Sequence, residues 1–207
     1  FRFMRGWIKQ GKAGKSRDMR ELLRDYVLIL ANTGMRQGTE SYGLKWKHLS
    51  EFEQRGRRYL AMWVDGKTGP RELIARHNCV AYLKRIHARS NDIQHLSWDQ
   101  LLAKGVDKHG VRSTNLHQTF EALLEDAGLL RDRRTEQKRT LYSLRHMYAT
   151  LALVKGHVDI HTLARQMGTS ALMIERHYSH LIPRQRAAEL AGGMRPEPND
   201  LKIAKPL

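Results

Sequence analysis

The sequence predicts a mainly α-helical domain with one small antiparallel β-sheet. Apolar residues recur at helical spacing over most of the chain, whereas a single stretch alternates apolar and polar residues around a Gly-containing turn. The length of 207 residues is enough for one sizeable domain, or for one domain with a short appendage. The apolar fraction of 41% is ordinary for a folded chain.

The N-terminal part is expected to hold a basic segment followed by two helices. Residues 1–17 carry several lysines and glycines, and we expect them to form a partly ordered lead-in or linker. From Asp18 the apolar residues follow helical spacing as far as Gly34, a residue type that commonly ends helices. A second, short helix is predicted at 38–44, so that Arg36 is exposed at the junction between the two helices.

The small sheet is predicted from two neighbouring stretches. Residues 57–64 alternate between apolar and other side chains, as a half-buried strand does. Residues 65–70 contain two glycines and a proline, which is typical of a turn. Residues 71–75 are then expected to pair back as a second strand, so that the two strands form a hairpin.

The remainder of the domain is predicted to be helical. Ser170 is suited to cap the start of a helix, and Pro183 is suited to begin one. Residues 192–207 contain three prolines and few apolar residues, so we expect a loose tail. Helices are predicted at 78–89, 114–127, 143–155, 159–167, 171–180 and 184–190.

The charge of the chain predicts a polyanionic partner. Lysine and arginine number 37 against 21 aspartates and glutamates, a formal net charge of +16. Nucleic acid is favoured over an anionic membrane surface, because no segment is a separate basic amphipathic anchor and none approaches the ~20 apolar residues of a membrane span. A merely basic, soluble surface remains the alternative. Cys79 is the one cysteine of the chain, which excludes an internal disulfide framework and is typical of the reducing cytoplasm.

Cutting DNA without a metal needs three kinds of group. A nucleophile attacks the phosphodiester, cations stabilise charge on its non-bridging oxygens, and an acid protonates the leaving 5′ oxygen. Arginine suits the second task because its planar fork donates two parallel hydrogen bonds to phosphate, lysine suits the third, and tyrosine can attack directly. The chain offers these groups in four segments: Thr33-Gly34-Met35-Arg36 followed by Leu44-Lys45-Trp46, then Gly66-Lys67-Thr68-Gly69, then Leu141 to Thr150 around Arg145, and finally Gly168-Thr169-Ser170 followed by Ile174 to His180.

The four segments, in this order and spacing, resemble the tyrosine site-specific recombinases of the phage integrase family. The resemblance covers about residues 18–182 and implies the catalytic-domain fold of that family. It matches Arg36 and Arg145 to the two arginines that clamp the scissile phosphate. It matches Lys67 to the lysine proposed as general acid, and Tyr178 to the nucleophile that forms a 3′-phosphotyrosine.

Several positions differ from the commonest family pattern. Tyr142 stands where a histidine is usual before the second arginine, and Thr169 stands where a histidine or tryptophan is usual. Both hydroxyls can still donate a hydrogen bond to a phosphate oxygen. Glu40 lies four residues after Arg36 rather than three, so its support of that arginine is less certain. The family pattern gives His146 a place near the phosphate, and we expect it to make a structural hydrogen bond rather than to act as a base.

The resemblance also implies the wider context of the reaction. The partners would be double-stranded DNA recombination sites, bound by a homotetramer in the cytoplasm of a bacterium, with no membrane. An N-terminal core-binding domain would close a clamp around the duplex, and the C-terminal helix and loose tail at 183–207 would dock on a neighbouring protomer. No cofactor is needed. The pairs His157 with His161 and His177 with His180 lack the cysteine or carboxylate cluster of a familiar zinc site, so we expect no metal.

Other functions remain open from the sequence. Tyr142 and Thr169 give some support to a DNA-binding protein that has lost catalysis and only occupies recombination sites, whereas the presence of Arg36, Lys67, Arg145 and Tyr178 argues against it. A relaxing topoisomerase of the type IB kind would share the same chemistry. Individually, Tyr178 is also explained as a core aromatic that packs with Ile174, and Lys67 as a solvated lysine in a turn.

Overall fold

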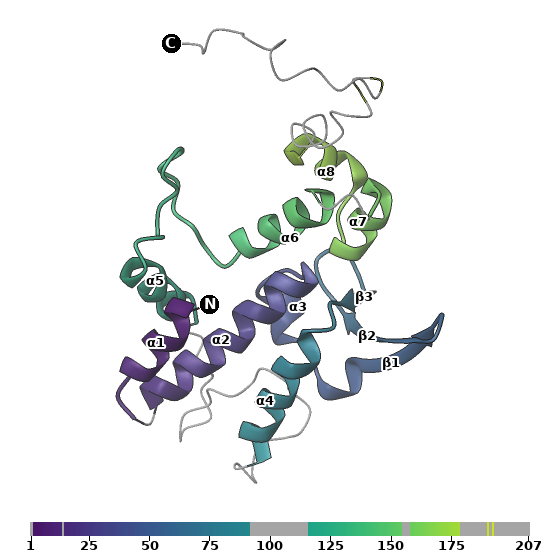
Figure 1. Ribbon diagram of the computed structural model, residues 1–207. Helices are drawn as coiled ribbons and strands as arrows, with labels where there is room; N and C mark the ends of the chain where they lie inside the picture. Colours follow the sequence, from purple (N-terminus) through teal and green to yellow (C-terminus); the bar gives the residue numbers. More distant parts are fainter. Residues whose placement is uncertain are drawn as a thin grey trace, which may run out of the picture.

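The computed structural model describes residues 2–13, 15–91, 116–154, 158–178, 190 and 192. It is a mainly helical domain with one small antiparallel sheet, as predicted, although the sheet has three strands and not only the two of the predicted hairpin (Figure 1). The helices are α1 (Arg2–Gln10), α2 (Lys15–Thr33), α3 (Thr39–Tyr42), α4 (Cys79–Asn91), α5 (Leu116–Asp126), α6 (Ser143–Val154), α7 (Ile160–Met167) and α8 (Ala171–Tyr178), with a 3-10 turn at Trp46–His48. The strands are β1 (Leu49–Gln54), β2 (Arg57–Val64) and β3 (Arg71–Ala75).

The sheet is antiparallel in the order β1-β2-β3. The predicted hairpin is confirmed: Val64 pairs with Arg71 across the turn, and the register continues to Leu60 opposite Ala75. Strand β1 was not predicted. It carries five exposed residues out of six, because it lies at the edge of the sheet and leaves its side chains in solvent.

The N-terminal segment contains a helix, which corrects the expected partly ordered lead-in at 1–17. Helix α1 buries Trp7, whose indole Nε1 donates to a carboxylate oxygen of Asp126 on α5 at 2.6 Å. The guanidinium of Arg20 on α2 lies over the Trp7 ring, 3.9 Å from its centroid. Trp7 thus contacts both α2 and α5, and these contacts fix α1 on the domain. The basic composition of the segment does not indicate this.

The ends of α7 and the start of α8 carry local capping signals, of which the cap at Ser170 was predicted. Asp159 caps α7 by accepting from the Thr162 N–H at 2.9 Å, and Gly168 ends it in a left-handed conformation with φ 62°. The Ser170 hydroxyl accepts from the Met173 N–H at 3.2 Å at the start of α8, as predicted. The elements predicted at 179–189 and 193–207, including most of the helix at 184–190, lie outside the described residues, as do His157 and His180.

The buried apolar residues form two cores. The first core joins α1, α2, α4 and α5 to the inner face of the sheet, and the second core joins α6, α7 and α8 (Figure 1). Helix α6 also packs on α2, and α7 packs on β3, so the two cores meet along these contacts. In the part of the chain that the structure describes, no helix is both long and apolar enough to cross a membrane.

Candidate active site

Arg36 lies between α2 and α3, where the two cores meet. Its backbone N–H donates to Glu40 Oε2 at 2.8 Å, and its Nη1 donates to Glu40 Oε1 at 3.0 Å. Nη1 also donates to the Thr68 hydroxyl at 3.1 Å, and Nη2 donates to the Gly168 carbonyl at 2.5 Å. A guanidinium has five N–H donors, so these contacts leave two for another acceptor. The side chain is 24% exposed, which gives such an acceptor access.

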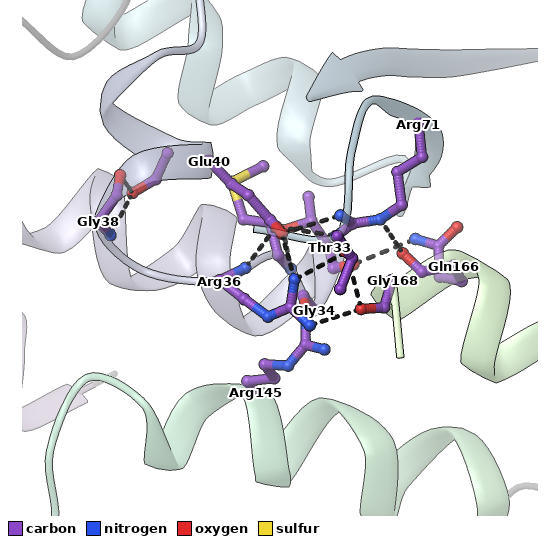
Figure 2. Close-up of polar contacts among 12 residues, drawn as sticks. Thr33, Gly34, Arg36, Gly38, Glu40, Arg71, Arg145, Gln166 and Gly168 are labelled. Carbon is purple, nitrogen blue, oxygen red and sulfur yellow. Dashed lines mark hydrogen bonds and ion pairs between the residues drawn. The ribbon is translucent and has the colours of Figure 1, made fainter. Parts of the chain in front are cut away.

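Glu40, which bonds Arg36 directly, is itself held by a second arginine. Arg71 on β3 donates from Nη1 and Nη2 to the two carboxylate oxygens, each at 2.8 Å, a bidentate pair (Figure 2). Burial raises the pKa of the Glu40 carboxyl, but the bonds from Arg71 and Arg36 outweigh it and keep the pKa below its ordinary value. The extra residue between Arg36 and Glu40 therefore does not prevent the support, because a spacing of four brings both to one side of the α2–α3 junction.

The carbonyl of Gly168 joins the second core to this network. It accepts from Arg36 and also from the Thr68 hydroxyl at 3.2 Å, in the turn that carries Lys67 (Figure 2). Gly168 has a positive φ of 62°, and a Cβ there would lie 2.4 Å from Arg71 Nη1. The backbone conformation therefore favours glycine, and a side chain here would also have to displace the Arg71 guanidinium.

Arg145 comes to the same place from α6. Its side chain is buried, and its Nη1 donates to the Gly34 carbonyl at 2.7 Å. Burial lowers the pKa of the guanidinium, and the positive charge of Arg36 lowers it further. Arg36, Arg71 and Arg145 surround the single carboxylate Glu40, which leaves a formal charge of +2 on these four side chains. Such an excess is costly in a partly buried place unless an anion binds there.

Tyr178 ends α8 beside Arg145. Its ring is buried in the second core with Ile174, as the core-aromatic alternative predicts, yet its hydroxyl lies 2.5 Å from His146 Nδ1 on α6. Burial raises the pKa of the Tyr178 hydroxyl to about 12, the neighbouring Tyr142 adds to this, and the charge of Arg145 opposes it. Burial lowers the pKa of His146 below its ordinary 6.5, with further contributions from His177 and Arg145.

The remaining predicted residues differ in their exposure to solvent. Tyr142 is exposed and meets the His146 ring edge-on at 5.1 Å between centroids. Thr169 is half-buried next to Gly168, and its N–H donates to the Ala164 carbonyl at 2.9 Å. Lys67 is exposed at the hairpin turn, one residue from Thr68. The site thus brings together segments that are more than 100 residues apart in the sequence.

Three contributors to this network were missed by the sequence analysis. Arg71 and Thr68 belong to the predicted hairpin, but nothing in their spacing shows that they face Glu40 and Gly168. Gln166 donates from Nε2 to the carbonyls of Thr33 (3.1 Å) and Ile74 (2.9 Å), and its Oε1 accepts from the Ile74 N–H at 2.9 Å. It thereby ties α7 to β3 and to the end of α2, next to Arg36.

A cavity of about 810 Å³ lies on another side of α7. Tyr59, Ile74, Arg76, Tyr148 and Gln166 are among the residues that line it. Arg36, Arg145 and Tyr178 do not line this cavity, so we do not assign it to the arginine site despite its volume.

Known proteins with a similar fold are found among solved structures. No protein-family model and no curated protein sequence matches the chain. XerH site-specific recombinase, in a post-cleavage complex with palindromic difH substrate, is 24% identical over 92% of this chain with a TM-score of 0.64. The Tn1549 transposon integrase, in complex with transposon right end DNA, is 17% identical over 92% with a TM-score of 0.59. XerA recombinase is 23% identical over 89% with a TM-score of 0.56.

These similarities are similarities of fold, and this chain matches only part of the length of each protein. The chain spans 50% of the XerH chain, 63% of the integrase chain and 65% of the XerA chain. Its eight described helices and its three-stranded sheet agree with the architecture predicted from the four segments around Arg36, Lys67, Arg145 and Tyr178. The chain therefore has the catalytic-domain fold of the tyrosine recombinases.

Proposed function

We propose that this chain is the catalytic domain of a site-specific DNA recombinase, an integrase that cleaves and rejoins DNA through a 3′-phosphotyrosine at Tyr178. The observation that carries the proposal is the closeness of Arg145 both to Arg36 and to Tyr178, in a cluster with an excess of positive charge. A phosphodiester is the anion that these groups fit, since both arginines have N–H donors beyond those that bond the protein. Integration or excision of a mobile element is the biological reaction.

The reaction needs no metal in this scheme. Arg36 and Arg145 donate to the non-bridging oxygens and stabilise the charge that develops on them. The Tyr178 oxygen attacks phosphorus, and Lys67 gives a proton to the leaving 5′ oxygen. The phosphotyrosine keeps the energy of the broken bond, so a 5′-hydroxyl can later attack it and rejoin a strand. Tyr142 and Thr169 serve as hydroxyl donors to the phosphate in place of the histidines of the usual pattern. His146 lies near the phosphate beside them.

The partners follow from the same proposal. The chain acts on double-stranded recombination sites as a homotetramer in the bacterial cytoplasm, with residues 183–207 docked on a neighbouring protomer. The catalytic domain spans residues 18–182 and works with a core-binding domain that closes a clamp around the duplex. The DNA complexes of XerH and of the Tn1549 integrase support the choice of DNA as partner.

Covalent capture on nicked DNA tests this function. Duplexes tiled across the DNA on either side of the gene, each with a nick that lets the cleaved end diffuse away, are incubated with the protein and separated under denaturing conditions. A recombinase yields a protein–DNA adduct, whereas a DNA-binding protein without catalysis yields none. Recombination between two captured duplexes then separates a recombinase from a relaxing topoisomerase, which yields the adduct alone.

DNA affinity is expected to depend strongly on salt. The net charge of +16 implies several phosphate contacts, each of which releases condensed counterions. With on the order of four contacts, the dissociation constant should rise about 100-fold between 50 and 200 mM salt. Fluorescence anisotropy with labelled duplexes of unrelated sequence checks this. A slope near zero in a plot of log affinity against log salt would assign the charge to another partner.

Thr169→His is expected to keep or increase the rate of cleavage. An imidazole N–H reaches farther than a threonine hydroxyl, and a protonated ring adds positive charge near the phosphate. The gain should be largest below pH ~6.5, where an unperturbed imidazole is charged. Single-turnover cleavage of the captured duplex measures it, with Thr169→Ala as the variant that removes the hydroxyl. A large loss in Thr169→His would mean that the site has been rebuilt around threonine.

A further inference from the structure

The hydroxyl of Tyr178 has a partner that the proposed reaction does not yet use. It lies 2.5 Å from His146 Nδ1, within the range of a hydrogen bond, and the two residues are presented by different helices, α8 and α6. Burial of the Tyr178 ring in the second core fixes the direction of its hydroxyl. His146 keeps part of its surface in solvent, while its ring packs beside those of Tyr142 and Tyr178.

The direction of the proton in this bond follows from the two pKa values. Burial, His177 and Arg145 hold the pKa of His146 below 6.5, so the ring is neutral at neutral pH. The Tyr178 hydroxyl, with a pKa of about 12, keeps its proton under the same conditions. The hydroxyl therefore donates and Nδ1 accepts, which places the ring proton on Nε2. A neutral histidine that accepts from a nucleophile has the form of a base.

We propose that His146 is the general base that removes the proton of Tyr178 as this oxygen attacks the phosphate. The proposal rests on the proposed function. The Tyr178 proton moves to Nδ1 and the freed electron pair forms the oxygen–phosphorus bond. The bond from phosphorus to the 5′ oxygen breaks, and that oxygen takes a proton from the Lys67 ammonium. Rejoining runs in reverse: the 5′-hydroxyl returns a proton to Lys67, and the imidazolium of His146 returns one to Tyr178.

The raised pKa of the Tyr178 hydroxyl means that its attack needs a base to remove the proton. Only about one in 10⁵ molecules carries Tyr178 as phenolate at pH 7 when its pKa is about 12. The other described neighbours of Tyr178 are less suited to take its proton. Tyr142 is itself a phenol, Arg145 is a cation without an acceptor, and the ring centroid of His177 lies 6.3 Å from that of Tyr178. His146 is thus the neighbour that is both in contact with the hydroxyl and able to take its proton.

The rate of cleavage and its pH dependence test whether His146 acts as the base. His146→Gln is expected to slow single-turnover cleavage of the captured duplex by roughly 10²–10⁴-fold with little change in DNA affinity. The pH profile of the wild-type rate should fall below the pKa of His146, and His146→Gln should lose this fall. The matched control is His161→Gln, which changes an exposed histidine on α7 that does not contribute to the pKa shifts of His146 or Tyr178, and its rate should stay within about twofold of the wild type.

A duplex with sulfur in place of the scissile 5′ oxygen identifies which proton each residue moves. The thiolate departs without protonation, so this duplex should restore cleavage by Lys67→Ala but not by His146→Gln. Restoration of both variants would make His146 an acid for the leaving group and overturn the proposal. Wild-type rates in His146→Gln would overturn the base while leaving the recombinase intact, whereas absence of capture by the wild type would remove both.

The free protein provides a check that does not depend on cleavage. In ¹⁵N-labelled protein, the Nδ1 and Nε2 shifts of His146 should report the Nε2-protonated tautomer. Tyr178→Phe removes a donor that stabilises the neutral ring, so the pKa of His146 should rise toward 6.5. A ring with its proton on Nδ1, or a pKa unchanged by Tyr178→Phe, would mean that the hydroxyl does not donate to this histidine.

Discussion

Tyr178→Phe is expected to reduce covalent capture of nicked DNA to the level of a protein-free control, while DNA affinity changes by less than about twofold. The phenylalanine ring preserves the buried contacts in the second core and removes only the hydroxyl that attacks phosphorus. Loss of the hydrogen bond to His146 should lower the free energy of unfolding by about 1 kcal/mol. Denaturing gels, anisotropy and thermal unfolding measure the three quantities.

The control for this prediction is Tyr148→Phe. Tyr148 is a second buried tyrosine of the same core, and its ring lies against Gly34. This variant should capture DNA as the wild type does. Capture that persists in Tyr178→Phe would remove Tyr178 as nucleophile, and Tyr148 and His177 would be tested next.

Arg145→Ala is expected to slow cleavage by about 10²–10³-fold, because one preorganised donor to the developing charge is lost. Affinity should fall by much less, since this is one phosphate contact among several. Arg36→Ala should give the same division between rate and affinity. Single-turnover rates and dissociation constants, measured on the captured duplex, check both variants.

Folding has to be separated from chemistry for Arg145, because its guanidinium also bonds the Gly34 carbonyl from a buried position. Arg145→Lys retains the charge without the planar fork and should still lose most of the rate. The exposed Arg165 on α7 provides the matched control: Arg165→Ala removes a positive charge without touching the cluster. Equal losses of rate and affinity in the Arg145 variants would assign this arginine to general docking on DNA.

Most helices could be predicted because their apolar faces and end signals are local. The caps at Asp159 and Ser170 and the glycine after α7 lie within a few residues of the ends they mark. The elements that were missed depend on distant partners. Helix α1 is fixed through Trp7 by Asp126, and β1 is a strand because β2 pairs with it, although its exposed side chains show little alternation.

The candidate site divides in the same way. The motif order predicted Arg36, Arg145 and Tyr178 as site residues, and in the structure Arg145 lies close to both of the others. The bonds that orient them run between segments far apart in the chain, such as the bidentate pair of Arg71 with Glu40. Such contacts form only after the hairpin and α7 have packed on the end of α2, so the residue pattern alone does not reveal them.

Gln166 has a consequence for the solubility of the domain. Strand β3 lies at an edge of the sheet, where free backbone groups invite pairing with another chain and hence aggregation. The amide of Gln166 bonds both the N–H and the C=O of Ile74, as a neighbouring strand would. One side chain therefore closes this stretch of edge to a foreign strand, and the same residue that steadies the arginine site also keeps copies of the domain from adding to one another's sheets there.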